Sequence, residues 1–154
     1  MNDIISLELD EKTVARRTQD IEQEKKIAIY DLLEKNYFKL VKSNLTGPFN
    51  LFLSIQENRI IFNIRNEQKV SLIIIALSLN PFRGIIKDYL SICDSYFQAI
   101  KLLSPAQIET IDMARRSLHN EGSVIVKERL EGKVDVDKNT SRRLFTLISV
   151  LHLR

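Results

Sequence analysis

The sequence has few of the residues on which metal and cofactor sites depend: one cysteine, two histidines and four glycines in 154 residues. The single Cys93 cannot form an intramolecular disulfide, and with His119 and His152 it falls short of the roughly four ligands of a structural zinc site. The glycines never cluster into GxxxxGK or GxGxxG, so neither phosphate-binding loop is present. We therefore expect no metal and no cofactor.

Other absences concern location and partners. The first residues, MNDIISLELDEK, lack the basic and apolar regions of a signal peptide. The longest apolar runs, near residues 70–79 and 144–153, are far shorter than the roughly 20 residues that span a bilayer. The net charge of +3 comes from 23 basic and 20 acidic residues that are interspersed, which gives little support for nucleic acid as a partner. We expect a cytoplasmic protein without a membrane span.

The composition is that of an ordinary globular protein, with 44% hydrophobic and 28% charged residues. A chain of 154 residues suits one domain with a real core, and no repeat or long linker divides it. We therefore predict a single domain over residues 1–154. Its first part, 1–79, should hold a helix and an antiparallel sheet, and its second part, 80–154, should be helical.

The N-terminal half alternates between strand and helix patterns. Residues 4–9 alternate weakly and could form a short strand, whereas 10–18 are polar and fit either a loop or a short helix. An amphipathic helix is predicted over 19–36, packed on a sheet. Three strand patterns follow, at residues 51–55, 60–64 and 69–79. Their short polar connections predict an antiparallel meander, with residues 4–9 as a candidate fourth strand.

The C-terminal half reads as consecutive helices. The first is predicted over 81–102, with Asn80 as its N-cap and an apolar stripe facing the core; the stripe comprises Ile85, Tyr89, Ile92, Cys93, Tyr96 and Ile100. The second begins with Ser104, Pro105 and Gln107, which together form the signature of a capping box, and Gly122 is a plausible C′ residue at its end.

Beyond Gly122, residues 123–131 predict another short helical segment and 134–137 an extended connector. Asp137 is expected to cap a last helix over 138–152, where Arg143 falls near the apolar side and needs a carboxylate partner. The resulting fold class is α+β: an antiparallel meander of three or four strands, packed against the N-terminal amphipathic helix and three or four C-terminal helices.

Four strings in the chain carry a resemblance: DYLSICDSYFQAI, SPAQIETIDMARRSLHNEG, KERLEGKVDVD and RRLFTLISVLH. Together they are similar to the sequences of a family of small uncharacterised proteins from alphaproteobacteria, number 0262 in the UPF series. The resemblance covers nearly the whole chain. It implies membership of a family whose function is unassigned, and it implies no catalytic or binding residue.

Some residues suggest chemistry that their positions argue against. Cys93 could be a nucleophile with His119 as its base, but it falls on an apolar helix face, where a free cysteine usually acts as a small hydrophobe. Tyr89 and Tyr96 could stack on bases, yet seven residues apart on an apolar stripe they are more often core residues. The pair at 142–143 is better explained as a solvated or ion-paired helix start than as a phosphate contact.

One polar stripe on the second helix is the main candidate site. Helical geometry brings together Asp112, Arg115, Arg116 and His119, and Asn120 and Glu121 follow in the next turn. As an anion site, the guanidiniums would hold a phosphate or carboxylate, His119 would donate a proton near neutral pH, and Asp112 would orient an arginine. The structural interpretation is a set of ion pairs along the helix, and we favour it. An exposed, unpaired Arg116 would count against it.

Two functions of different class remain. The first is a small cytoplasmic interaction or regulatory protein that binds a protein partner or a second copy of itself, favoured because no catalytic grouping is recognisable. The alternative is an enzyme or binding protein for a small anionic metabolite, acting at the polar stripe. A closed pocket lined by the stripe, rather than a flat flank, would favour this alternative.

Overall fold

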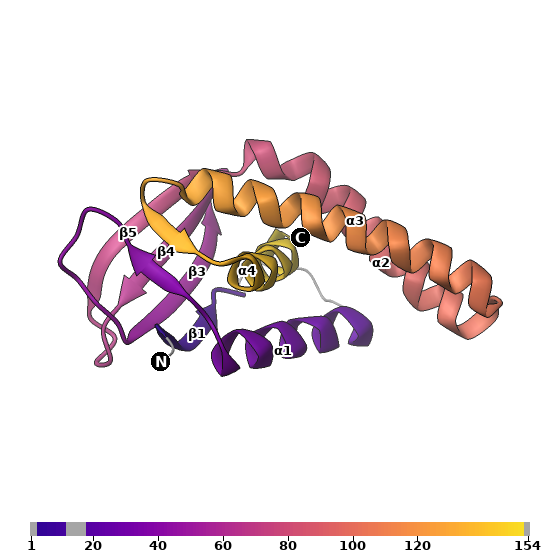
Figure 1. Cartoon of the computed structure of the whole chain (residues 1–154), viewed down its shortest axis with the longest axis horizontal. Coiled ribbons are helices and arrows are strands. Elements are labelled where there is room, and N and C mark those ends of the chain that lie inside the picture. The colour runs from indigo at the N-terminus through magenta and orange to yellow at the C-terminus, as the bar shows by residue number, and fades with distance from the viewer. Residues whose placement is uncertain (1–2, 12–17, 153–154) are drawn as a thin grey trace.

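The computed structural model of the chain describes residues 3–11 and 18–152. Its elements are β1 Ile4–Leu9, α1 Gln19–Glu34, β2 Phe38–Leu40, β3 Phe49–Gln56, β4 Arg59–Arg65, β5 Ser71–Ser78, α2 Asn80–Leu102, α3 Pro105–Leu130, β6 Val134–Val136 and α4 Lys138–His152. The expected α+β class is confirmed, with sheet and helices arranged as in Figure 1. Most of the loop or short helix predicted over 10–18 lies outside the described residues.

The larger sheet has the strand order β1-β3-β4-β5. The predicted meander is confirmed for β3, β4 and β5, which pair antiparallel. A two-residue turn joins β3 to β4: Glu57 and Asn58 have φ angles of 49° and 63°, as a type I′ hairpin turn requires. The apolar residues at alternate positions of these strands lie on one face and belong to the hydrophobic core.

The prediction that the fourth strand would also be antiparallel is wrong. β1 is the fourth strand, but it pairs parallel with β3, so the sheet is mixed. The reason lies in the connection, because parallel neighbours need a long crossover and α1 stands between β1 and β3 in the chain. The predicted helix between these two strands therefore indicated that they could pair in parallel.

The amphipathic helix α1 was expected to pack on a sheet, but it lies mainly against α4, and its main contact with the sheet is at β1. Its C-terminal end is attached to β1 by Asn36, which is buried. The Asn36 side-chain oxygen accepts hydrogen bonds from the backbone N–H groups of Asp3 and Ile4, at 3.0 and 2.9 Å. Its amide donates to the carbonyl oxygens of Ile4 and Leu32, each at 2.9 Å.

The sequence does not predict the second, two-stranded sheet. β2 pairs antiparallel with β6, so Phe38 faces Val136 across 98 positions of the chain. The extended connector predicted at 134–137 is therefore a strand. Each strand is only three residues long, too short for alternation to identify it.

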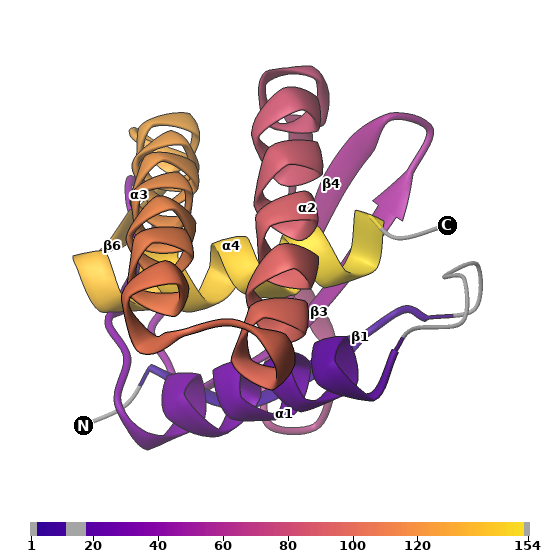
Figure 2. The ribbon, with the colours of Figure 1, turned by 90° about the vertical axis from the view of Figure 1, so that its right-hand side faces the viewer.

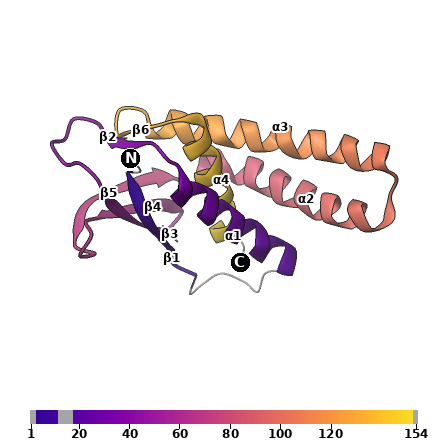
Figure 3. The same cartoon turned by 60° about the horizontal axis from the view of Figure 1, so that its bottom comes forward.

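α2 and α3 form a long antiparallel hairpin, whose far end extends away from the sheet (Figures 1 and 3). Asn80 was predicted as the N-cap of α2, but it is the first helical residue, and Leu79 holds the cap position without a side-chain hydrogen bond. The prediction for α3 was correct at its start: Ser104 and Gln107 form both hydrogen bonds of a capping box. Ile100, predicted on the buried stripe, is 50% exposed because it lies near the far end.

The predicted end of the second helix at Gly122 is wrong. α3 continues without a break to Leu130, and the segment predicted as a separate helix is its last part. Gly122 lies where α3 and α4 approach closely, and a Cβ atom there would be 2.2 Å from Cζ of Phe145. Glycine is present at this position because of packing, and not because of a left-handed cap.

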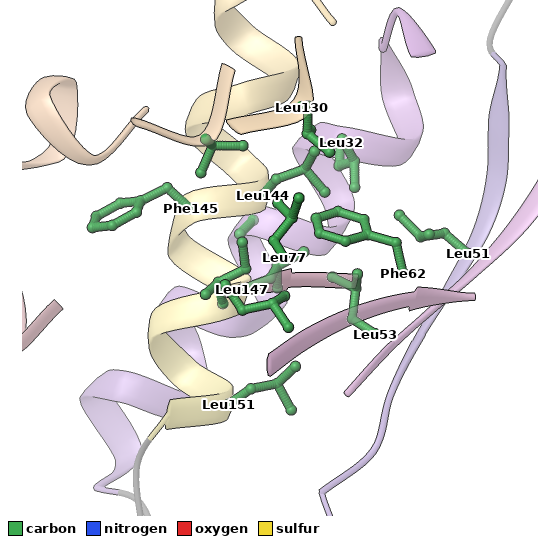
Figure 4. Packing of buried hydrophobic residues seen from close by; sticks show 14 of the residues in the cluster. Leu32, Leu51, Leu53, Phe62, Leu77, Leu130, Leu144, Phe145, Leu147 and Leu151 are labelled. Carbon is green, nitrogen blue, oxygen red and sulfur yellow. The ribbon is translucent and has the colours of Figure 1, made fainter. Parts of the chain in front are cut away.

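α4 is the central element, and it contacts α1, α2, α3 and β3. Its start is as predicted: the side chain of Asp137 accepts a hydrogen bond from the Thr140 N–H, at 2.8 Å. Figure 4 shows leucines of α4 beside apolar residues of the sheet. The largest fully buried side chains are Phe38, Phe49, Phe62, Phe82, Phe145, Ile4, Leu32, Leu51, Leu53, Ile60, Ile64 and Ile86. Each such side chain contributes about 1.5–3 kcal/mol to folding.

Candidate functional site

The predicted polar stripe occupies the middle of α3, on the side that faces α4 and α1. Asp112 is its hub. Its Oδ1 atom accepts hydrogen bonds from Arg115, at 2.6 Å from Nη2 and 3.1 Å from Nε, while its Oδ2 atom lies 2.6 Å from Nη2 of Arg116. Burial tends to raise the pKa of Asp112, but the two guanidiniums outweigh this effect and lower it. Ion pairing along the helix is thus present, as the structural interpretation predicted.

The two arginines of the stripe have different surroundings. The Arg115 side chain is 23% exposed, and its guanidinium carbon lies 4.5 Å from the centre of the Tyr96 ring, a cation–π contact. The Arg116 side chain is 69% exposed. An Arg116 that was both exposed and unpaired would have counted against the structural interpretation. Arg116 is exposed, but it is paired with Asp112.

His119 is buried and held in place by α4. Its Nε2 atom lies 2.8 Å from the hydroxyl oxygen of Thr146 and 3.0 Å from the carbonyl oxygen of Arg142. Its ring stacks on Tyr89, with centroids 5.3 Å apart. Burial and the neighbouring arginines lower the pKa of His119 to about 4, so the ring is neutral at pH 7. A buried, neutral ring does not favour the expected role as a proton donor near neutral pH.

Two further predicted residues, Asn120 and Glu121, do not line the pocket that Arg115, Arg116 and His119 border. Asn120 is exposed and outside the pocket lining, and its side-chain oxygen accepts a hydrogen bond from Nη1 of Arg142. Glu121 is exposed and lies outside the pocket lining. Of the six candidates, Arg115, Arg116 and His119 reach the pocket, and Asp112 and Asn120 hold arginines that do.

The pocket itself has a volume of about 240 Å³ and is lined by residues of α1, α2, α3 and α4. Figure 2 shows how these four helices are arranged. Its lining comprises Glu24, Ile27, Ala28, Tyr89, Arg115, Arg116, His119, Arg142, Arg143 and Thr146. Four of these side chains are arginines and one is a carboxylate. The stripe therefore borders a cavity and is not a flat flank.

Three charged residues of the lining were not predicted as site residues. Arg142 and Arg143 had been interpreted as a helix start, and Arg143 does have the carboxylate partner that we expected: its Nη2 lies 3.4 Å from Oδ2 of Asp31. Glu24 of α1 is half-buried, and burial raises its pKa although Arg115 and Arg143 act in the opposite direction. No local signal joins these residues to α3, because the contact arises only when α1 and α4 pack together.

The thiol of Cys93 is buried close by, and burial raises its pKa to about 11. A protonated, enclosed thiol is a poor nucleophile, so pairing with His119 gives no reactive dyad. Within residues 3–11 and 18–152, no three His, Cys, Asp or Glu side chains are grouped so that they could hold a metal ion. In the same part of the chain, no helix combines the length and apolar character needed to cross a membrane.

Comparisons with known proteins identify relatives of the whole chain. The family model described as "Uncharacterised protein family (UPF0262)" matches residues 1–154. A UPF0262 protein of Rhodospirillum rubrum is 55% identical, over 98% of this chain and 92% of the relative. A UPF0262 protein of Cereibacter sphaeroides is 53% identical over 99% of both chains. One from Bradyrhizobium diazoefficiens is 54% identical over 98% of this chain and 92% of the relative. No solved structure matches significantly. The chain belongs to the uncharacterised protein family UPF0262.

Proposed function

We propose that this protein binds a small anion, a phosphate or a carboxylate, in the pocket between α1, α3 and α4, and that it does so without catalysis. The observation that carries the proposal is the state of Arg142. Its guanidinium is hydrogen-bonded to the neutral side chain of Asn120, and among the described residues no carboxylate lies within ion-pairing distance. Burial, then Arg143 and Arg115, lower its pKa. A half-buried guanidinium beside like charges is stabilised by an incoming anion.

The size of the pocket supports a small ligand. A volume of about 240 Å³ is below the roughly 300–1,000 Å³ of pockets that enclose drug-sized molecules, so it suits a phosphate or a short carboxylate. The charges support an anion, because Glu24 is the single carboxylate in the lining. Binding is a better interpretation than turnover, because His119 is neutral and locked between Thr146 and Tyr89.

Thermal melting in the presence of orthophosphate or short carboxylates tests this proposal. At a hundred times its dissociation constant, a ligand adds about 2.7 kcal/mol to the free energy of unfolding. For a chain of this size that raises Tm by several degrees, at about 2–4 °C per kcal/mol. Chloride at equal ionic strength serves as the reference salt.

The Arg142→Gln variant should lose the shift, since it removes the charge and keeps most of the side chain. Arg129→Gln is the matched control, because Arg129 is exposed on the last turn of α3, outside the pocket. A general salt effect would raise Tm equally in both variants. The proposal fails if no anion shifts the wild type, or if the shift survives in Arg142→Gln.

A second candidate function is self-association through the far end of the α2–α3 hairpin. Large apolar side chains are exposed there: Leu102 at 78%, Met113 at 63%, Ile100 at 50% and Leu103 at 43%. A groove of about 350 Å³ runs beside Ala99 and Leu102, with Asp94 at one side. We propose a second copy of the chain as the occupant, because the charges on the solvent face of α2 are self-complementary.

Asp94 and Lys101 are seven residues apart, so they share one flank of α2. In an antiparallel contact about a two-fold axis, Asp94 of one copy would face Lys101 of the other. Light scattering over a range of concentrations tests this. Asp94→Lys alone should yield a monomer, and Asp94→Lys combined with Lys101→Asp should restore the dimer. A wild type that stays monomeric at high concentration, or a dimer insensitive to Asp94→Lys, rules it out.

We further propose that the chain acts as one domain in a reducing, cytoplasmic setting. The buried core includes residues from β1 to α4, and the anion pocket needs α1 as well as the later helices. Cys93 is a free, buried thiol, which fits a reducing compartment.

A further inference from the structure

We propose a second binding site, for an anion that carries an apolar tail, in a cavity larger than the anion pocket. This cavity has a volume of about 710 Å³, within the range of pockets that enclose molecules of drug size. It lies between the β3–β4 turn, the start of α2 and the end of α4, and it shares no residue with the anion pocket. Its lining comprises Ile55, Glu57, Asn58, Leu79, Arg83, Lys87, Leu90 and His152.

The walls divide into an apolar part and a cationic part. Ile55, Leu79 and Leu90 supply the apolar surface. Arg83 and Lys87 supply positive charge from α2, four residues apart and therefore on the same side of the helix. An apolar wall beside two cations matches a molecule with an acyl or similar tail and one anionic head group.

The two cations lack acidic partners among the described residues. Arg83 is hydrogen-bonded through Nε to the neutral side chain of Asn58, at 3.1 Å. No ion pair to Lys87 is present in the described part of the chain. The carboxylate in the lining is Glu57, whose side chain is 87% exposed and lies 3.8 Å from Arg59. The positive charge on this side of the cavity is thus left for a ligand to neutralise.

Arg83 is also held in place before any ligand arrives. Asn58 adopts φ 63° in the β3–β4 turn, and its backbone oxygen accepts a hydrogen bond from the Leu79 N–H at 3.0 Å. Its side-chain amide donates to Oδ1 of Asn80 at 2.8 Å, which leaves Oδ1 of Asn58 for Arg83. The turn therefore orients Arg83 from the neighbouring element. Preorganisation of this kind reduces the entropic cost of binding.

Calorimetric titration with octanoate is the direct test, with octanol and octylamine as probes that keep the tail and change the head. We expect octanoate to bind in the micromolar to millimolar range, octanol at least tenfold more weakly, and octylamine not measurably. Arg83→Gln and Lys87→Gln should each weaken octanoate at least tenfold. Lys127→Gln, on the exposed side of α3, is the control and should bind as the wild type does.

Two further variants separate the possible results. Asn58→Gly removes the side chain that orients Arg83, so it should weaken the binding of octanoate. Glycine also favours a positive φ, so the turn should be kept and Tm should change little. Arg142→Gln should leave octanoate binding unchanged. The inference is overturned if octanoate fails to bind, if it binds equally to Arg83→Gln, or if Arg142→Gln abolishes binding. The last result would assign octanoate to the anion pocket instead.

Discussion

Gly122 offers the sharpest test of the structure, because replacing it with alanine should destabilise the protein although alanine is the better helix former. A Cβ atom at this position would lie 2.2 Å from Cζ and 2.3 Å from Cε1 of Phe145. Carbon atoms in contact are about 3.5–4.0 Å apart, so the overlap exceeds 1 Å. Phe145 cannot easily move aside, because it is fully buried, with its ring 5.2 Å from that of Tyr89 and 5.8 Å from that of His119.

The magnitude follows from two opposing effects. Overpacking a core costs about 1–3 kcal/mol, and an overlap this large belongs at or above the upper end. The helix propensity of alanine over glycine returns about 1 kcal/mol. We therefore expect Gly122→Ala to lower the free energy of unfolding by about 2 kcal/mol. At about 2–4 °C per kcal/mol for this chain length, Tm should fall by about 4–8 °C.

Gly84 provides the matched control for this experiment. It is an exposed helical glycine in α2, and a Cβ atom there would meet nothing within 4 Å. Gly84→Ala should therefore gain about 1 kcal/mol of helix propensity, and Tm should rise by about 2–4 °C. Thermal and urea unfolding of both variants decide the matter. If Gly122→Ala melts at or above the wild type, α3 and α4 do not approach as described.

Two other predictions concern titration. Burial lowers the pKa of His119 from 6.5 to about 4, so the folded protein holds the ring neutral where the unfolded chain would protonate it. The stabilisation is fully present above pH 6.5. About 3 kcal/mol of the free energy of unfolding is lost as the pH falls toward 4. In urea unfolding, the free energy of unfolding should fall less between pH 7.5 and pH 4.5 in His119→Gln than in the wild type. An equal fall in both proteins would contradict the burial of the ring. Burial also raises the pKa of Cys93 to about 11, so at pH 8 a chromogenic disulfide should react slowly with the folded protein and rapidly in urea. Fast reaction of the folded protein would refute this.

The parts of the fold that sequence predicted well are those with local signals. Ser104 and Asp137 cap their helices through contacts with residues three positions along, so short strings of sequence contain both the donor and the acceptor. The meander was predictable for a similar reason, since its strands are joined by short polar turns.

The errors arise where distant segments decide the structure. Phe38 pairs with Val136 from the far end of the chain, and nothing near either residue indicates a strand of three residues. Glycine often follows the end of a helix, so the sequence predicts an end at Gly122, whereas glycine is needed there because Phe145 packs against it from another helix. The parallel β1 could have been inferred, because α1 supplies the crossover that parallel strands require.

In the candidate site too, contacts within one helix could be predicted from the sequence, whereas contacts between helices could not. Asp112, Arg115 and Arg116 interact within one helix, so their spacing of three and four residues was sufficient to predict the ion pairs. Arg142 and Glu24 come from two other helices and could be added only after those helices were placed. The burial of His119 was equally invisible, because Thr146, which lies 2.8 Å from its ring, belongs to α4.

The position of the pocket follows from the packing of α4. From Thr140 to Leu151 this helix is buried at every residue except Arg142 and Arg143, which are half-exposed. α1 and α3 approach these two side chains from either side, with Asp31 near Arg143 and Asn120 bonded to Arg142. This gap in the cover of α4 is lined by four arginines and one carboxylate, Glu24, so positive charge predominates there and the guanidiniums repel one another. An anion in this gap would neutralise the repulsion and hold α1 against the other two helices, so ligand binding and the docking of α1 should be thermodynamically coupled.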